Sequence, residues 1–592
     1  MCGILVAFSK TGSVDPSACR RALSAMYWRG PDFAFSRSWE DRLFLGQSVL
    51  SITGDPRPGV GRYQRSPSGR YEVLYNGEIY NLHDVVARFF ATRPELTPRY
   101  GTDTEALVNL HEVLAPANVP PALDGMFAYA LFDESARQLH LARDVQGEKS
   151  LYVYEDTRQI VVASEIRAIR ALVPGIGVDP QALRDYFRTR HLMLFERTIY
   201  DGIREVAPGR LETLDLDTGK WSETQAVRLR DWIDPQRMGD ATHRSADDLV
   251  DELDELLGRC VREMIPARRY AAVLSGGVDS SLLASYLVRD GDPDLLVAVN
   301  HLGKDRISAD LGGFERALGR PVETLAVDAA GYAAEIGRCQ QACGSPLHSH
   351  SFVPQSQQSA RVRAAGCRVL FGGEGADELF GGYDAYLRPV VPASRFSPSP
   401  YTARHDTPIR FAADAPEAQE HDLAAAWRAA LDAYDFVDDE RARVTLAMMY
   451  CDAAQQLSAV GLRGADLMSM MWSVETRSVY LRRPLVTFAL NLPVAMKADP
   501  GAAAPLLRAK PLLKRLFLRR YDAELLVEKQ GFAGFPNEAA AWLGTPDDYL
   551  TRAFLGIDRV SLATGWSDHA TNWKLINVEY FLRHGAAAVE AL

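Results

Sequence analysis

The chain has 592 residues and a formal net charge of −11, and 47% of its residues are hydrophobic and 24% charged. This composition is typical of a soluble globular protein and excludes a disordered, collagen-like or disulfide-dense chain. The acidic balance argues against a nucleic-acid partner and against a membrane partner, and no apolar run is long enough to span a bilayer.

The seven cysteines include no CxxC pair, and an odd number cannot all pair in disulfides. Neither a disulfide framework nor a structural zinc site is therefore expected. The apolar stretch over residues 3–8 has no basic segment before it, so it does not predict a signal peptide. We expect a cytoplasmic protein.

Short apolar or alternating runs predict a strand-rich first half with two helices, near residues 15–27 and 102–114. The pattern is that of an α+β domain. The expected strands cover residues 3–8, 43–52, 71–75, 127–132, 138–142, 151–154 and 159–163.

Residues 211–244 are polar and rich in turn formers, and we place a domain boundary near residue 235. An amphipathic helix follows over 249–264, and then strands and helices alternate, which predicts a mostly parallel sheet. The expected elements are strands 270–274, 295–300 and 367–371 and a helix over 280–288. Residues 389–417 are rich in Pro, Ser and Ala and predict a long loop or mobile insert. The predicted domains are 1–235 and 236–592.

Cys2 is a candidate nucleophile. Removal of the initiator methionine would make it the first residue, with an α-amine whose ordinary pKa is about 7.7–8.0 and which can act as the base for its own thiol. Taken alone, a cysteine here is more simply a small buried hydrophobe.

Several motifs downstream make a functional role for Cys2 the better interpretation. They are Arg29-Gly30-Pro31-Asp32, Asn76-Gly77-Glu78-Ile79-Tyr80-Asn81, Thr102-Asp103, Asp124-Gly125-Met126-Phe127-Ala128, Ala142-Arg143-Asp144, Gly147-Glu148-Lys149 and Ala163-Ser164-Glu165-Ile166. Together these motifs closely resemble the glutaminase domain of the asparagine synthetase family, which implies an N-terminal-nucleophile αββα sandwich.

The resemblance implies that Cys2 attacks the side-chain amide of glutamine. Asn76 and the backbone amide of Gly77 would form the oxyanion hole, and Glu78 and Asp103 would hold the α-ammonium group.

Two positions in this half depart from the family. Trp28 replaces a histidine, and Val49 stands where the family has an arginine that grips the α-carboxylate. A valine cannot make a bidentate ion pair. Either another basic residue reaches in, or glutamine binds weakly, or the donor differs.

A second site is indicated by Ser275-Gly276-Gly277-Val278-Asp279-Ser280-Ser281, between a predicted strand and a predicted helix. It is not a Walker A motif, and it matches the pyrophosphate-binding loop of ATP pyrophosphatases. Glycines let backbone amides approach phosphates, serines add hydroxyl donors, and the helix N-terminus favours negative charge. This implies an α/β ATP-pyrophosphatase domain, of the adenine nucleotide alpha hydrolase-like class.

The run from Gly372 to Tyr383 is similar to the family's second ATP motif. By resemblance, Asp279 and Asp377 hold Mg2+ and Glu374 manages protons near the reacting carboxyl group. Lys529 matches a late lysine motif, where it would neutralise developing charge. The remaining ATP-binding positions that the resemblance implies are Leu274, Ser275, Gly276, Gly277, Ser280, Ser281, Val299, Gly372 and Gly373. Lys514 resembles a further basic position.

Two segments near the expected acceptor pocket depart from the family. In residues 473–482, Val479 replaces a proline and Arg482 an aspartate, which indicates either a changed acceptor or a rearranged ion pair. Residues 345–354 hold no arginine and no acid, whereas aspartate as acceptor needs both a cation and an anion. We interpret His348 and His350 there as pocket lining or surface histidines rather than metal ligands.

The resemblance therefore predicts an AMP-forming amide ligase that uses ATP and Mg2+, a glutamine-like nitrogen donor and a small carboxylate acceptor. The acceptor is expected to be a non-aspartate acid of specialised metabolism. The alternatives are an asparagine synthetase acting on aspartate, an enzyme releasing hydroxylamine from a glutamyl hydroxamate, an intramolecular ring-forming synthetase of the β-lactam or lasso-peptide type, and a non-catalytic scaffold. The resemblance alone implies a homodimer.

Overall fold

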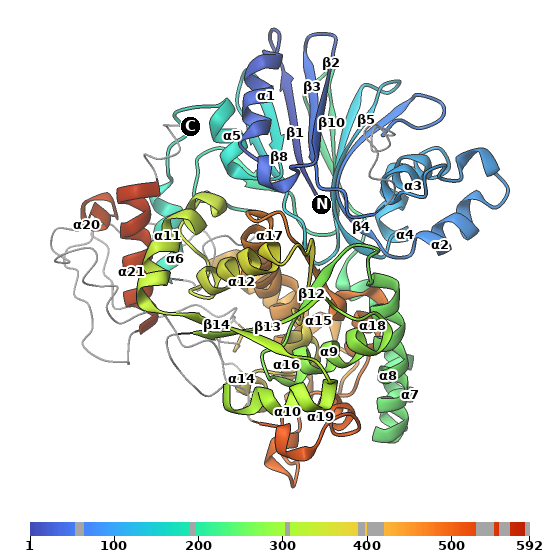
Figure 1. Ribbon diagram of the computed structural model, residues 1–592. Coiled ribbons are helices and arrows are strands. Elements are labelled where there is room, and N and C mark those ends of the chain that lie inside the picture. The colour runs from blue at the N-terminus through green and yellow to red at the C-terminus, as the bar shows by residue number, and fades with distance from the viewer. Residues whose placement is uncertain are drawn as a thin grey trace.

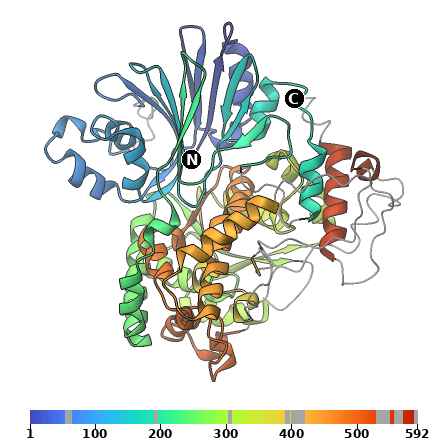
Figure 2. The same ribbon diagram turned by 180° about the vertical axis from the view of Figure 1, so that it is seen from behind.

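The computed structural model describes residues 1–53, 64–188, 196–301, 308–388, 397–398, 420–527, 550–555 and 569–585. Seen from both sides, the N-terminal half (blue to cyan) stacks on the C-terminal half (green to red), and the N-terminus lies where the two halves meet (Figures 1 and 2). No helix of the described residues is long and apolar enough to cross a membrane.

The first sheet has six strands, and every neighbouring pair in it is antiparallel. In spatial order they are β2 (Phe33–Trp39), β3 (Leu43–Val49), β1 (Cys2–Ser9), β8 (Gln159–Ala163), β7 (Tyr152–Glu155) and β9 (Ile203–Glu205). Side chains of β1 alternate between two cores: Ile4 and Val6 face the second sheet, and Leu5 and Ala7 face covering helices.

The second sheet has five antiparallel strands. They are β11 (Trp221–Gln225), β10 (Arg210–Asp215), β6 (Gln138–Arg143), β5 (Gly125–Asp133) and β4 (Tyr71–Ile79). Apolar side chains from both sheets form one core between them. On their outer faces, α1 (Pro16–Ser24) and α5 (Ile166–Leu172) pack on the first sheet, and α3 (Asp103–Leu110) packs on the second. The N-terminal half is thus the αββα sandwich that the sequence predicts.

The third sheet is parallel throughout. Its order is β14 (Val322–Val327), β13 (Leu295–His301), β12 (Tyr270–Val273), β15 (Val369–Gly372) and β16 (Glu475–Ser478). Because β13 and β15 flank β12 on opposite sides, the carboxyl end of β12 is the point where doubly wound sheets bind ligands.

Helices surround the third sheet and connect the layers. The longest of the described helices is α8 (Ala246–Met264), whose Leu249, Leu253 and Leu257 lie in the largest core, as its amphipathic pattern predicts. The helices not yet named are α2 (Leu82–Val85), α4 (Val119–Ala122), α6 (Pro180–Arg188), α7 (Pro235–Thr242), α9 (Val278–Asp290), α10 (Ser308–Leu318), α11 (Ala329–Cys343), α12 (Phe352–Ala364), α13 (Ala376–Phe380), α14 (Asp384–Leu387), α15 (Glu420–Ala433), α16 (Glu440–Cys451), the π-helix η7 (Asp452–Leu462), α17 (Arg463–Met470), α18 (Arg483–Leu490), α19 (Pro511–Leu518), α20 (Leu550–Leu555) and α21 (His569–Tyr580).

The polar, turn-rich sequence over 211–244 hid two strands, because β10 and β11 lie there and complete the second sheet. The strand β11 is an edge strand whose residues after Trp221 are exposed, so it carries no hydrophobic alternation to read. The expected loop over 389–417 falls almost wholly outside the described residues. The boundary at residue 235 stays a prediction.

Buried ion pairs join the two halves. The Asp466 carboxylate on α17 forms ion pairs with the Arg29 guanidinium at 2.9 Å and the Lys149 ammonium at 3.1 Å. The Arg482 guanidinium pairs with the Asp124 carboxylate at 2.8 Å. Arg482 also contacts Glu263 on α8. The reversed charge at Arg482 therefore belongs to a rearranged ion pair, the second of the two readings that the sequence left open.

Candidate active sites

Cys2 is the first residue of β1 and lies opposite Val49 on β3. Its backbone N–H donates to Asn76 Oδ1 at 2.9 Å. Asn76 is fully buried, and its Nδ2 has no hydrogen-bond partner among the described residues. Since a buried donor is rarely left unpaired, Asn76 Nδ2 is a ready donor for a ligand oxygen beside Cys2.

Gly77 follows on β4 and has no room for a side chain. A Cβ there would lie 2.2 Å from the carbonyl oxygen of Met126 on the neighbouring strand β5. Glycine is therefore required next to Asn76, as the motif predicts. Burial raises the pKa of the Cys2 thiol, so the thiol is neutral in the structure and attack requires a base.

Met1 precedes Cys2 in the structure and is itself buried. Its ammonium nitrogen lies 3.3 Å from Leu50 O and 3.4 Å from Glu475 Oε2 on β16. Cys2 N is therefore a peptide nitrogen here, and the free α-amine that the sequence predicts requires removal of Met1.

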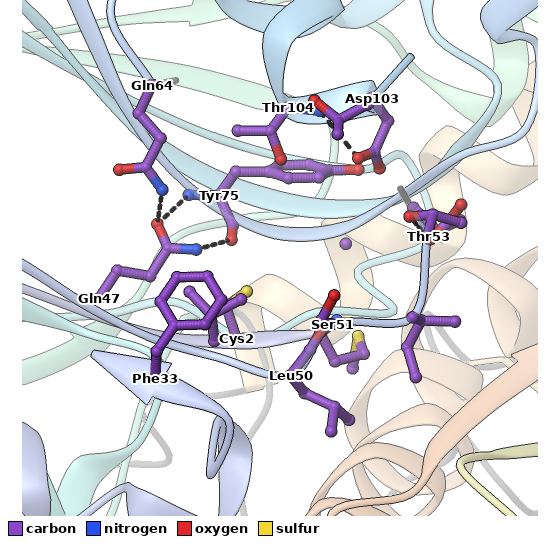
Figure 3. A pocket seen from close by; sticks show the side chains of 16 residues that line it. Cys2, Phe33, Gln47, Leu50, Ser51, Thr53, Gln64, Tyr75, Asp103 and Thr104 are labelled. Atoms are coloured by element: carbon purple, nitrogen blue, oxygen red, sulfur yellow. Dashed lines mark hydrogen bonds between the residues drawn. The ribbon is translucent and has the colours of Figure 1, made fainter. Parts of the chain in front are cut away.

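A pocket opens beside Cys2 between β3, β4 and the start of α3 (Figure 3). Glu78 and Asp103 both line it, as the sequence predicts. Asp103 Oδ1 accepts Thr104 N at 2.8 Å, and Oδ2 accepts Ile79 N at 3.3 Å, so the carboxylate is fixed at the N-terminus of α3.

Burial raises the pKa of Glu78 to about 8, and the nearby Asp103 carboxylate reinforces the effect. The Arg477 guanidinium of β16 lies 3.4 Å from the Glu78 carboxylate and opposes this rise in its pKa. Burial likewise raises the pKa of Asp103. The pair is therefore short of positive charge and suited to an incoming ammonium group.

Val49 lies in the wall of this pocket. None of the described residues that line it is a lysine, arginine or histidine. Trp28 does not line it; its backbone oxygen accepts the Ser473 hydroxyl at 2.6 Å from the other half of the chain. Of the two departures, only Val49 therefore bears on the pocket.

The second candidate site lies at the carboxyl end of β12. Leu274 is buried and its N–H donates to Val297 O at 2.9 Å on β13, which holds the loop against the sheet. The Ser275 and Ser280 hydroxyls are 2.9 Å apart, and Ser275 N donates to Ser280 Oγ at 3.0 Å. Gly276 takes φ +79°, which favours glycine, and Gly277 is the N-cap of α9.

The second ATP motif lies at the end of the neighbouring strand β15. A Cβ on Gly373 would be 3.3 Å from Asp279 Cβ, so the two motifs are in contact. A Cβ on Gly372 would fall 2.0 Å from Glu374 Oε2. A serine at position 372 would thus exclude the position that Glu374 occupies. Burial raises the pKa of Glu374, and its Oε2 has no hydrogen-bond partner among the described residues.

Lys510 is the residue of this site that sequence reasoning missed. Its ammonium group contacts both Asp279 and Asp377, the two carboxylates assigned to Mg2+ by resemblance. Lys510 has φ 51° immediately before Pro511, and no local pattern in the sequence signals this placement. Lys514, which the sequence indicated as a further basic position, donates instead to the Leu506 backbone oxygen.

The carboxylates fit a magnesium ion, because Asp279 and Asp377 already converge on one cation and supply the oxygen ligands that Mg2+ prefers. Among the described residues no cluster of three or more His, Cys, Asp or Glu side chains could hold a metal. Further ligands would therefore be water and phosphate oxygens, the usual arrangement for Mg2+.

The remaining predicted positions are distributed as follows. Ser281 is buried on α9 and Val299 is buried on β13, next to β12. Lys529 lies outside the described residues. His348 is buried rather than exposed: its Nδ1 lies 2.9 Å from Ala459 O and its ring stacks on Phe352, while His350 meets Trp573 edge to face.

Each half of the chain matches the model of a known protein family. The glutamine amidotransferase domain model matches residues 1–225, and the asparagine synthase model matches residues 252–572. The chain is 28% identical to a putative glutamine-hydrolysing asparagine synthetase of Mycobacterium bovis, over 66% of this chain and 61% of the relative. It is 27% identical to amidase chry2 of Gibberella zeae, over 62% and 55%.

It is also 26% identical to asparagine synthetase B of Escherichia coli, over 65% of this chain and 65% of the relative. The alignments thus span less than two thirds of each relative's own length. The family model, however, covers more than half of this chain. The chain belongs to the asparagine synthase family, with a glutamine amidotransferase domain at its N-terminus.

Proposed function

We propose that this chain is an AMP-forming amide ligase with two sites. Cys2 releases ammonia from a glutamine-like amide, and the ammonia amidates a carboxylate that ATP has activated in the second site. One observation carries this proposal: a single chain combines two arrangements. Cys2 lies beside an Asn76 Nδ2 that has no partner among the described residues, and the two ATP motifs are in contact at the carboxyl end of β12.

At the first site, the Cys2 sulfur attacks the amide carbon. Asn76 Nδ2 and the Gly77 N–H stabilise the oxyanion, and such preorganised donors are commonly worth about 2.7–4 kcal/mol each. Ammonia leaves, and water hydrolyses the thioester to regenerate the thiol. Glu78 and Asp103 hold the donor's ammonium group.

At the second site, the Ser275–Ser281 loop and the N-terminus of α9 hold the phosphates. Magnesium, held by Asp279 and Asp377, would offset charge on the departing pyrophosphate. The acceptor carboxylate attacks the α-phosphorus, and pyrophosphate leaves. Ammonia then displaces AMP and loses a proton, which Glu374 would take. Lys510 and Lys529 would neutralise the charge that develops.

The acceptor is proposed to be a carboxylic acid other than aspartate. Residues 345–354 hold no arginine and no acid, and the buried His348 is engaged with the backbone of η7. The similarity to amidase chry2 of Gibberella zeae agrees with this proposal only in that this relative is not named an asparagine synthetase. The alternative is asparagine synthesis. An intramolecular ring-forming reaction is disfavoured, because those relatives tend to lose the cysteine that this chain keeps.

The test supplies purified protein with ATP, Mg2+, aspartate and excess ammonium, and measures asparagine and AMP by mass spectrometry. Ammonium bypasses the donor pocket and its Val49. Asparagine at a useful rate would overturn the non-aspartate proposal and leave the ligase in place. ATP binding without asparagine supports another acceptor, which a panel of carboxylic acids with AMP release as the readout would then identify.

A further inference from the structure

Tyr75 places a hydroxyl group in the pocket beside Cys2 that the proposed mechanism does not use. Tyr75 lines this pocket, immediately precedes Asn76 on β4 and is only 2% exposed. Its hydroxyl has no hydrogen-bond partner among the described residues. Since a buried hydroxyl is rarely left unpaired, this atom is available to a ligand that enters the pocket.

The position of Tyr75 is fixed at both its backbone and its ring. Its N–H donates to Gln47 Oε1 at 3.1 Å, and its carbonyl oxygen accepts Gln47 Nε2 at 2.7 Å. Its ring packs in one core with side chains of α3, and the hydroxyl end lies next to Asp103, the first residue of that helix (Figure 3). The hydroxyl is thus held beside one of the two carboxylates that the proposed function assigns to the donor's ammonium group.

The chemistry of an ammonium group explains what this hydroxyl could do. A primary ammonium group has three N–H donors, and each one that is buried needs an acceptor. The carboxylates of Glu78 and Asp103 can accept two of them. Burial and the neighbouring Asp103 carboxylate raise the pKa of Tyr75, so its phenol stays neutral and its oxygen keeps a lone pair for the third.

We propose that Tyr75 is a third residue that binds the amide donor, and that its hydroxyl oxygen accepts a hydrogen bond from the donor's ammonium group. The inference rests on the proposed function and deepens it, because it adds a group that selects amides carrying a protonated amine. It changes no chemical step at Cys2.

Tyr129 on β5 provides a matched control. It lies directly opposite Tyr75 in the sheet, is also buried, and its hydroxyl likewise has no hydrogen-bond partner among the described residues. Tyr129 is not among the described residues that line the pocket. An effect confined to Tyr75→Phe would therefore report a contact with the donor and not the loss of a buried hydroxyl.

The experiment measures ammonia release by the full-length protein from L-glutamine and from glutaramic acid, the glutamine analogue without the amine. Tyr75→Phe should raise KM for glutamine by about tenfold or more and leave kcat nearly unchanged, because a hydrogen bond to a charged group is lost equally in the ground state and the transition state. The kcat/KM for glutaramic acid should not change. Tyr129→Phe should match the native protein with both amides.

The native thermal midpoint is expected in both variants, because neither removed hydroxyl has a partner among the described residues. An unchanged KM for glutamine in Tyr75→Phe would overturn the inference. Equal losses for the two amides, or equal losses in the two tyrosine variants, would also overturn it, since the effect would then be structural. If the native protein releases no more ammonia than Cys2→Ala from either amide, the proposed role of Cys2 fails instead.

Discussion

Each of the two sites holds a pair of carboxylates, but the pairs differ in what lies between them. Asp279 and Asp377 share the ammonium group of Lys510, a cation built into the chain. Glu78 and Asp103 share no lysine among the described residues; Arg477 approaches Glu78 from β16, and burial still raises the pKa of Glu78 to about 8. The first pair already shares one cation of the chain, whereas the second is left for the ammonium group of a ligand.

The difference shows how a pair of carboxylates can serve two purposes. A carboxylate pair short of positive charge selects a cationic substrate, because binding relieves repulsion that folding has imposed. A pair that already holds a lysine must exchange or share it before a metal ion binds. Substitutions at each site separate these two cases.

The largest effect should come from Cys2→Ala. We expect donor-dependent amide formation to fall by roughly 10⁴-fold or more, because no other described group of the pocket can form the thioester. Amide formation from added ammonium should persist. Parallel assays with donor and with ammonium check this, and unchanged donor-dependent synthesis would refute the first site.

Asn76→Ala should lower the hydrolysis of the amide donor by about 10²–10³-fold, since it removes one oxyanion donor. Asn76→Asp is the control that keeps the Oδ1 acceptor for Cys2 N but loses the Nδ2 donor. Both variants should lose activity to a similar extent while ATP binding is unaffected. Near-native hydrolysis by Asn76→Asp would show that Nδ2 does not contact the substrate.

Lys510→Met tests the built-in cation. We expect Mn2+, measured without ATP by electron paramagnetic resonance or calorimetry, to bind about tenfold or more tightly, because Asp279 and Asp377 lose their shared ammonium group. Lys514→Met, four residues further on, is the matched control and should bind Mn2+ as the native chain does. Equal affinities in all three proteins would contradict a shared site.

The smallest effect is a pH dependence of stability. The pKa of Glu78 is raised in the folded chain from 4.5 to about 8, so the folded state binds its proton more tightly than the unfolded state. Stability therefore falls as pH rises through this window. We expect the thermal midpoint of the native chain to fall relative to Glu78→Gln over that range, and donor to restore it. Parallel curves for both proteins would contradict the raised pKa.

Sequence patterns predicted the sites where function depends on consecutive residues. The Ser275 loop and the Asn76-Gly77 pair are short motifs whose backbone requirements appear in the residues themselves, such as the missing space at Gly77. The apolar runs of β1 and β5 likewise predicted strands of an α+β domain, because both strands are buried. The sandwich itself was implied by the resemblance to the family.

Contacts between distant segments could not be predicted in this way. Lys510 reaches Asp279 across 231 residues and Arg482 reaches Asp124 across 358, and nothing local at either arginine or lysine specifies the partner. The edge strand β11 was missed for a related reason, since its pairing with β10 is decided by the sheet and not by its own hydrophobicity.

The ion pairs between the halves determine what would happen if each half were expressed separately. Arg29 and Lys149 belong to one half and Asp466 to the other, and although burial opposes it, these cations hold the pKa of Asp466 at about 2. Salt screens exposed charges but reaches buried ones poorly. Expressing either half alone would expose these charged groups to water without their partners. The ion pairs therefore form only when the two halves are together.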